Sequence, residues 1–412
     1  MKVLHINTYD KNGGAAIAAL RLHNAMLLAN IDSKYLVLEK TLHDRIDILT
    51  ISRYSRYIKK IINNVLERNI TKNMNAIKGL FSSFKYGFKI VNRQEIIKAD
   101  IIYLHWINSF LNYNELKKLI KTGKPIFWFM HDMFPITGGC HHSFNCTNYV
   151  KKCHKCPYNK KGIDHSVRQY KAKKKLYKQY NNLYFVTPSR WLFSCVKNCD
   201  ITKNNKIYHI PNLIDMSLFK PIKKNVAREL FSINRNVMII GFGADYALNN
   251  KYKGWEYMEN ALLILKENGV IKNIGIELII FGSNYNKEVD DKIPYPIHFL
   301  GHLNDDYSMI MAYNCMDIFV IPSIAENFPN TVLESLSCNI PVVGFIIGGI
   351  PDMVNDNTGY LSEYKNSNDL AKGIALLIKE KKFNVREYVK SLNQTEIVNK
   401  HKDIWIINNI HH

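Results

Sequence analysis

The fold of this 412-residue chain is decided by residues 317–338, which read Asp-Ile-Phe-Val-Ile-Pro-Ser-Ile-Ala-Glu-Asn-Phe-Pro-Asn-Thr-Val-Leu-Glu-Ser-Leu-Ser-Cys. Ile318 to Ile321 form an apolar run closed by Pro322, a pattern typical of a buried strand in a parallel sheet. Pro329 suits the first turn of a helix, and Asn327 suits its N-cap. The stretch therefore predicts strand, loop and helix, with the helix N-terminus at the strand's carboxyl end, where α/β proteins bind anions.

Two glutamates mark this unit. Glu326 lies in the expected loop, where it could face the reacting end of a ligand, and Glu334 lies more than one turn into the expected helix, where it would face a group farther along the same ligand. Most pairs of glutamates are ordinary surface charges, so a role of these two in ligand binding has to be argued from the residues around them.

Those residues resemble the signature of retaining glycosyltransferases of family four, in which seven residues separate two glutamates. Glu326 and Glu334 occupy the two glutamate positions, and the segments 342–344 and 348–352 match the family pattern on the carboxyl side of the signature. The resemblance implies an α/β protein of the GT-B fold, with two Rossmann-like domains facing across a cleft that holds the active site. It also implies that Glu326 holds the hydroxyls of the transferred sugar and Glu334 the ribose. Phe328, Pro329, Asn330 and Thr331 match the segment between the two glutamates, whose backbone amides are implied to approach the donor's diphosphate.

A second phosphate contact is expected near residue 253. Residues 237–243 predict the first strand of a Rossmann-like domain, and Lys253 precedes a helix over 255–268. The resemblance implies an arginine and a lysine that clamp the diphosphate, where the negative charge of the leaving group grows. Lys253 matches the lysine. Tyr252 stands where relatives often have the arginine, so either Lys251 supplies the second cation or the clamp is weaker.

Three further positions are expected to line the site. Gly13 and Gly14 follow a strand over 3–6 and open a helix, so backbone there can approach a ligand closely. Strands that end in His105 and His131 place both imidazoles at the rim where α/β proteins bind ligands. The resemblance implies that His131 contacts the sugar and that the glycine loop faces the donor phosphates and the acceptor. It also implies that a loop with Gly301 and Leu303 cups the nucleotide base.

Four of the eight cysteines fall in an insertion over residues 133–165. Cys153 and Cys156 have the spacing of half a zinc knuckle, whereas Cys140 and Cys146 are more widely spaced. Cysteines of a cytosolic chain stay reduced, which favours metal over disulfides. Two interpretations stay open: a structural zinc bound by four thiolates, or four free thiols. No catalytic metal is expected, because cations of the chain and helix dipoles would stabilise the leaving group.

The net charge is +21, and it is concentrated in the amino-terminal half. Residues 151–180 hold eleven Lys or Arg against one acid, a balance of +10, and residues 53–98 hold eleven against two, a balance of +9. Such patches attract anionic lipid surfaces or nucleic acid, although compositional drift explains them equally well, and nucleic acid ranks well behind. No run approaches the roughly 18–20 apolar residues of a membrane span. The amino terminus reads as a strand and not as a signal peptide, so we expect a cytoplasmic protein, with peripheral attachment to the inner face of the membrane left open.

The sequence therefore predicts a glycosyltransferase that moves a sugar from a nucleotide-diphosphate sugar to a saccharide or lipid-linked saccharide acceptor in cell-surface polysaccharide biosynthesis. Two alternatives are an epimerase of nucleotide-sugars with the same fold and a zinc-stabilised nucleic-acid-binding protein. The expected domains are residues 1–212, with the cysteine-rich insertion, and residues 213–385, which bind the nucleotide-sugar. Residues 386–412 are expected to form a helix that crosses back to the first domain.

Overall fold

The computed structural model describes residues 1–51, 53–71, 81–159, 164–233, 236–244, 246–269, 274–380 and 384–410, and side chains from residue 60 onward in the helix that spans 53–71. The chain divides into two compact units, which are described separately. Unit 1 comprises Met1–Leu213 and Thr395–His412, and unit 2 comprises Ile214–Gln394. Residues 160–163 of the expected insertion lie outside the described residues.

Unit 1 is built on a parallel sheet whose described strands run in the order β3-β2-β1-β4-β5-β6-β7. The order reverses between β1 and β4, so the loops that come after these strands diverge and leave room for a ligand. The strands are β1 (Lys2–Tyr9), β2 (Asp32–Glu39), β3 (Ile48–Thr50), β4 (Ile101–Leu104), β5 (Ile126–Phe129), β6 (Leu183–Thr187) and β7 (Ile207–His209).

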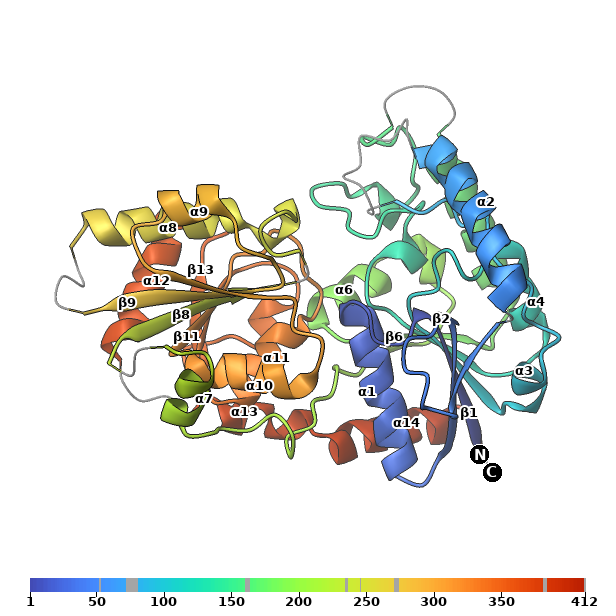
Figure 1. The fold of residues 1–412 in the computed structure, drawn as a ribbon. Coiled ribbons are helices and arrows are strands. Elements are labelled where there is room, and N and C mark those ends of the chain that lie inside the picture. The colour runs from blue at the N-terminus through green and yellow to red at the C-terminus, as the bar shows by residue number, and fades with distance from the viewer. Residues whose placement is uncertain are drawn as a thin grey trace. The chain divides into compact units, whose positions relative to one another are not determined.

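Helices flank this sheet, and they include one from the end of the chain (Figure 1). The apolar face of α14 is buried, and its His401 and Trp405 pack against Tyr103 of β4. The helices are α1 (Gly14–Leu28), α2 (Arg53–Thr71), α3 (Gln94–Lys98), α4 (Tyr113–Lys121), α5 (His165–Gln179), α6 (Arg190–Lys197) and α14 (Gln394–Ile407), with short 3-10 turns η1 (Phe134–Ile136), η2 (Asn148–Val150) and η3 (Asp200–Thr202).

Unit 2 repeats the plan with a parallel sheet whose described strands run in the order β10-β9-β8-β11-β12-β13. Its order reverses between β8 and β11, and residues 317–338 supply β11 at that point. The strands are β8 (Met238–Gly243), β9 (Ile276–Phe281), β10 (Ile297–Gly301), β11 (Ile318–Ile321), β12 (Val342–Phe345) and β13 (Gly359–Ser362).

Figure 1 shows α8 and α9 along one side of this sheet and α10 and α11 along the other. Apolar residues of α8 and α12 form one buried core with the strands. The helices are α7 (Lys224–Leu230), α8 (Trp255–Glu267), α9 (Lys287–Lys292), α10 (Asp306–Cys315), α11 (Asn330–Ser337), α12 (Ser367–Lys379) and α13 (Arg386–Val389), with turns η4 (Lys251–Lys253), η5 (Ile350–Asp352) and η6 (Lys390–Leu392).

Two sequence expectations about helix ends are wrong. Pro329 has an extended ψ of 123°, so it is the N-cap and not a residue of the first turn, and Asn327 lies two residues before it. The carbonyl of Pro329 accepts the first helical bond, from Val332 N–H at 3.2 Å. The tail helix begins at Gln394 and not at 386, because α13 and η6 come first.

Candidate functional site

The reversal in the sheet of unit 2 brings two predicted site residues together. Lys253 ends the turn η4 in the loop after β8, and Glu326 lies in the loop after β11. The ammonium of Lys253 donates to Oε1 of Glu326 at 2.6 Å, with the two side chains 25 % and 12 % exposed. Such a partly buried, charge-assisted pair holds both groups in place while each keeps a face open to a ligand.

Backbone packing fixes these two loops on each other. Gly254 has a φ of +73°, and a Cβ there would lie 1.8 Å from the carbonyl oxygen of Pro322, just after β11. Ile324 N–H donates to the carbonyl of Tyr252 at 2.8 Å. The loop of Lys253 is therefore seated on the segment that leads to Glu326, and only glycine permits that approach.

A third loop, after β12, closes on Glu326 in the same way. Gly348 has a φ of +54°, and a Cβ there would lie 1.7 Å from the carbonyl oxygen of Glu326. The Gly-Gly pair that resembles the family pattern thus supports the backbone of the catalytic candidate.

Glu334, the second glutamate of the signature, is only 4 % exposed on α11. The hydroxyl of Tyr313 on α10 donates to its Oε2 at 2.9 Å, and Tyr313 is packed between the rings of Phe281 and Phe319. Sequence reasoning missed Tyr313, because a tyrosine inside a mostly apolar helix carries no signal of a polar partner. Tyr313 fixes one carboxylate oxygen and so orients the predicted ribose contact.

The remaining donor-side candidates differ in exposure. Phe328, Pro329 and Asn330 are buried at the start of α11, and Thr331 is half-buried. Gly301 ends β10 with a φ of +64°, its carbonyl accepts from Gly282 N–H at 2.7 Å, and Leu303 is half-buried two residues later.

The two candidates for the second phosphate cation lie in contrasting environments. Lys251 is exposed, whereas Tyr252 is 8 % exposed and its backbone is anchored to the loop after β11. The ring at position 252 therefore belongs to the interior of unit 2.

In unit 1 the predicted His131 is the end of a chain of three imidazoles that crosses neighbouring strands. His5 Nδ1 lies 2.9 Å from His105 Nε2, and His105 Nδ1 lies 3.0 Å from His131 Nε2. A neutral imidazole has one N–H, so the tautomer of His131 is tied to the tautomers of the other two. Burial lowers the pKa of His5 and His105 well below the ordinary value and that of His131 to about 4, which keeps all three neutral at pH 7.

Asp132, next to His131, bonds to a histidine that sequence reasoning did not assign. Nδ1 of His141 lies 2.5 Å from its Oδ2, and Phe134 N–H donates to its Oδ1 at 2.8 Å. Burial alone would raise the pKa of Asp132, but His141 and these hydrogen bonds outweigh it and lower the pKa below the ordinary value. An ionised Asp132 therefore sits beside neutral His131.

The glycine loop of unit 1 is open. Gly13 has a φ of +87°, is the N-cap of α1, and would place a Cβ in open space; Gly13 and Gly14 are both exposed. A backbone free of side chains at a helix N-terminus is able to approach a ligand, as the sequence predicts.

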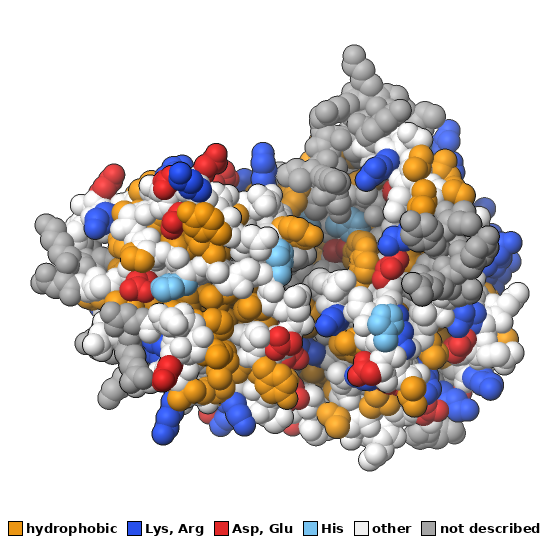
Figure 2. Space-filling model, in the orientation of Figure 1, with side chains coloured by type: hydrophobic (Ala, Val, Ile, Leu, Met, Phe, Trp, Pro, Cys, Tyr) orange, Lys and Arg blue, Asp and Glu red, His pale blue; other side chains and the backbone are white. Residues whose placement is uncertain are grey.

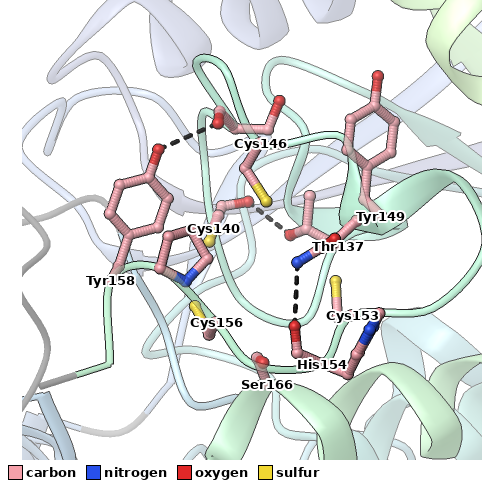
Figure 3. A pocket seen from close by; sticks show the side chains of 12 residues that line it. Thr137, Cys140, Cys146, Tyr149, Cys153, His154, Cys156, Tyr158 and Ser166 are labelled. Carbon is pink, nitrogen blue, oxygen red and sulfur yellow. Dashed lines mark hydrogen bonds between the residues drawn. The ribbon is translucent and has the colours of Figure 1, made fainter.

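The four clustered cysteines, Cys140, Cys146, Cys153 and Cys156, border one small cavity (Figure 3). Its volume is about 20 Å³. None of these four cysteines forms a disulfide. In the described part of the chain, no group of three or more His, Cys, Asp or Glu side chains is spaced to hold a metal ion as it stands.

Basic side chains do not gather into one continuous patch among the coloured residues of the face in Figure 2, where they alternate with acidic and neutral ones. Helix α2 is different, because it exposes Ile61, Ile62, Val65 and Leu66 in a basic stretch. No helix of the described residues is both long and apolar enough to span a bilayer.

Comparison with known proteins agrees with this architecture. Residues 237–380 match the family model of the group 1 glycosyl transferases. The chain is 22 % identical over 366 residues to WcaC of Escherichia coli K12, named as a colanic acid biosynthesis glycosyl transferase, and the match covers 83 % of this chain and 82 % of that one.

A second relative and a solved structure are also similar to this chain. The Escherichia coli UDP-Gal:alpha-D-GlcNAc-diphosphoundecaprenol alpha-1,3-galactosyltransferase is 25 % identical over 216 residues, which are 49 % of this chain and 54 % of that relative. The crystal structure of Anabaena HepE in complex with UDP and glucose superposes with a TM-score of 0.62 at 14 % identity, covering 98 % of this chain and 99 % of that one. The chain is a glycosyltransferase of the GT-B fold, and its residues 237–380 are a group 1 glycosyl transferase domain.

Proposed function

We propose that the protein transfers a sugar, with retention of its anomeric configuration, from a nucleotide-diphosphate sugar to an acceptor hydroxyl in the synthesis of a cell-surface polysaccharide. The observation that carries the proposal is the Lys253–Glu326 pair at the point where the strand order of unit 2 reverses. Two similar proteins support the pathway and the donor, because WcaC is named for colanic acid and HepE was solved with UDP and glucose.

The role of Lys253, Glu326 and the amides at the start of α11 is to stabilise the charges that develop during the reaction. Departure of the nucleoside diphosphate builds negative charge on its oxygens and positive charge on the sugar ring. Lys253 and the amides at the start of α11 would stabilise the negative charge. Glu326 would hold the sugar in a position where its carboxylate stabilises the positive charge. When no donor is bound, Glu326 keeps Lys253 in position; a diphosphate that arrives would then share the ammonium with it.

The remaining roles are those that the family resemblance implies. Glu334, oriented by Tyr313, would accept hydrogen bonds from the ribose, and Gly301 and Leu303 would lie against the base. His131 and the open loop at Gly13 and Gly14, all in unit 1, would contact the sugar and the acceptor. The name of the galactosyltransferase relative favours a lipid-linked saccharide as the acceptor class.

Replacing the pair tests the assignment. Glu326→Gln and Lys253→Met should each lower kcat/KM roughly tenfold to a hundredfold, because a hydrogen bond to a charged group contributes about 1.5–3 kcal/mol. The double variant should lose less than the product of the two single losses, because the residues act as a pair. Glu267→Gln, on an exposed position of α8, is the matched control.

Assays should begin with UDP-sugars and an undecaprenyl-diphosphate saccharide, and proton NMR of the product should report the anomeric configuration. Wild-type rates from both single variants with a productive donor would remove Lys253 and Glu326 from the mechanism. An inverted product would refute retention while leaving transfer intact.

We further propose that the protein works at an anionic membrane surface through α2. The helix combines exposed apolar side chains at residues 61, 62, 65 and 66 with basic neighbours, a composition that suits a lipid interface. Cosedimentation with vesicles that contain phosphatidylglycerol should be strong at low salt and weak at high salt. Equal binding to neutral vesicles would argue against it.

A further inference from the structure

We propose that Cys140, Cys146, Cys153 and Cys156 together bind one structural zinc ion. The four residues come from two turns separated in sequence, yet the fold sets them around a single cavity. Figure 3 shows their side chains bordering one space, with Tyr149 and Tyr158 closing two of its sides.

The size of the cavity selects a single ion. About 20 Å³ is close to the volume that one water molecule needs, which leaves room for a single ion. A space of this size that is bordered by four thiols suits a tetrahedral ion with sulfur ligands, which is the preference of zinc.

The sulfurs of Cys153 and Cys156 already accept hydrogen bonds. Gly138 N–H donates to Sγ of Cys153 at 3.2 Å. The sulfur of Cys156 accepts from the backbone N–H of Tyr158 and from the hydroxyl of Ser166. Donors of this kind stabilise thiolates more than thiols and act as the second layer of a metal site.

The charge around the cluster also fits. Four thiolates and one Zn²⁺ carry a net charge of −2, which an apolar interior would not tolerate alone. The fully buried Lys173 interacts electrostatically with Cys140 and Cys153, and its Nζ donates to the carbonyls of Phe134 and Thr137.

The sulfurs must close inward to reach a zinc ion, because Zn–S bonds are about 2.3 Å and the described side chains do not yet stand at that spacing. The proposal therefore requires the four side chains to rotate about their Cα–Cβ bonds when the ion binds. Lys155, in the segment between Cys153 and Cys156, has a φ of +43°, so the backbone bends sharply between these two cysteines. Binding replaces four S–H protons by one ion, and the protons pass to solvent.

The site would be structural, since four protein ligands leave no position for a substrate. It would pin the segment that carries His141, which bonds to Asp132 beside His131. The zinc thus supports the predicted site of unit 1 without touching substrate.

The test is the metal content of the full chain, purified without chelators. Mass spectrometry of the elements should find about one zinc per chain, as expected for four thiolate ligands. The double variant Cys153→Ser/Cys156→Ser should lose at least nine-tenths of it. Cys195→Ser, at a half-buried cysteine on α6 outside the cluster, should retain the wild-type content.

A second measurement does not depend on the variants folding. Titration of the folded wild-type chain with an organomercurial, monitored with a chromogenic chelator, should release the zinc as about four thiols react. Iron in place of zinc, no metal, or equal metal in the wild type and the double variant would overturn the proposal. Because no donor or acceptor enters these measurements, their failure is distinct from failure of the proposed transferase activity.

Discussion

Position 252 shows how one side chain limits what a substitution can test. Tyr252 is 8 % exposed, so Tyr252→Arg would bury a guanidinium where an aromatic ring now packs. Burying an unpaired charge costs several kcal/mol. We therefore expect this variant to lower the thermal midpoint without tightening the binding of a nucleoside diphosphate.

The exposed Lys251 offers the contrasting change. Lys251→Ala should leave the thermal midpoint unchanged and weaken UDP binding by up to about 1 kcal/mol, the range for a solvent-exposed ion pair. Calorimetry with UDP and a thermal scan of both variants check the pair of expectations. If Tyr252→Arg keeps full stability and binds UDP more tightly, position 252 reaches the phosphates after all.

At the scale of single residues, the sequence predicted the site residues but not their contacts. The family resemblance identified Glu326, Glu334 and Lys253 as candidates, but their contacts come from residues far away along the chain. Nothing in the sequence pairs Lys253 with Glu326, 73 positions away, or Tyr313 with Glu334. Such contacts depend on which strands become neighbours.

Among the elements, the loop after β12 makes the sharpest prediction. Gly348→Ala should destabilise unit 2 by well over the roughly 1–2 kcal/mol of a left-handed alanine, because its Cβ would lie 1.7 Å from the carbonyl of Glu326. If that loop yields, Glu326 moves, and kcat/KM should fall with the stability.

Gly123→Ala is the matched control for backbone strain. Gly123 has a φ of +77° but would place its Cβ in open space, so only the strain remains. Chemical denaturation of both variants separates the two effects. Equal losses of stability would mean that Gly348 is needed only for its backbone angle.

The position of elements was easier to predict than their ends. Apolar runs gave β8 and β11 to within a residue, because buried parallel strands are continuously apolar. Pro329 misled, since a proline tolerates both the first helical position and the position before it, and only its extended ψ distinguishes them.

For the molecule as a whole, unit 1 contains an unusual number of buried neutral histidines. Burial lowers the pKa of His23 and His131 to about 4 and that of His401 to about 3, and it holds His5 and His105 well below the ordinary value. The unfolded chain takes up protons on these imidazoles below about pH 6.5. In the folded chain, His23 and His131 do so only near pH 4 and His401 near pH 3, and the pKa values of His5 and His105 also lie well below the ordinary value. Protonation of these histidines therefore does not lower the free energy of unfolding above pH 6.5, and it lowers this free energy progressively as the pH decreases toward 4.

Thermal scans between pH 7.5 and 4.5 should show this loss. Each such histidine contributes a slope of at most about 1.4 kcal/mol per pH unit within that window. His401→Gln should reduce the slope, and His302→Gln, at an exposed position of unit 2, should not. A midpoint that stays constant down to pH 5 would show that these imidazoles are protonated in the folded state.

The two Rossmann-like units and the GT-B fold were predicted correctly from the sequence. The paired glutamates indicate the second unit, and apolar strands followed by glycine loops indicate both units. The imidazole chain was not predicted, although His105 and His131 were both singled out. His5 enters it only because β1 is inserted beside β4, a neighbour 100 residues away, and local patterns do not encode that pairing.

The discontinuity of unit 1 has a consequence for synthesis on the ribosome. The helix that covers Tyr103 and Phe129 lies in the last 18 residues, 395–412. At about 5–20 residues per second, translation of the 181 residues of unit 2 takes roughly 10–40 s, during which the nascent first unit cannot bury those rings under α14. A chaperone that binds exposed aromatic surface would find its target in that interval, and a premature stop codon near residue 394 would make the exposure permanent.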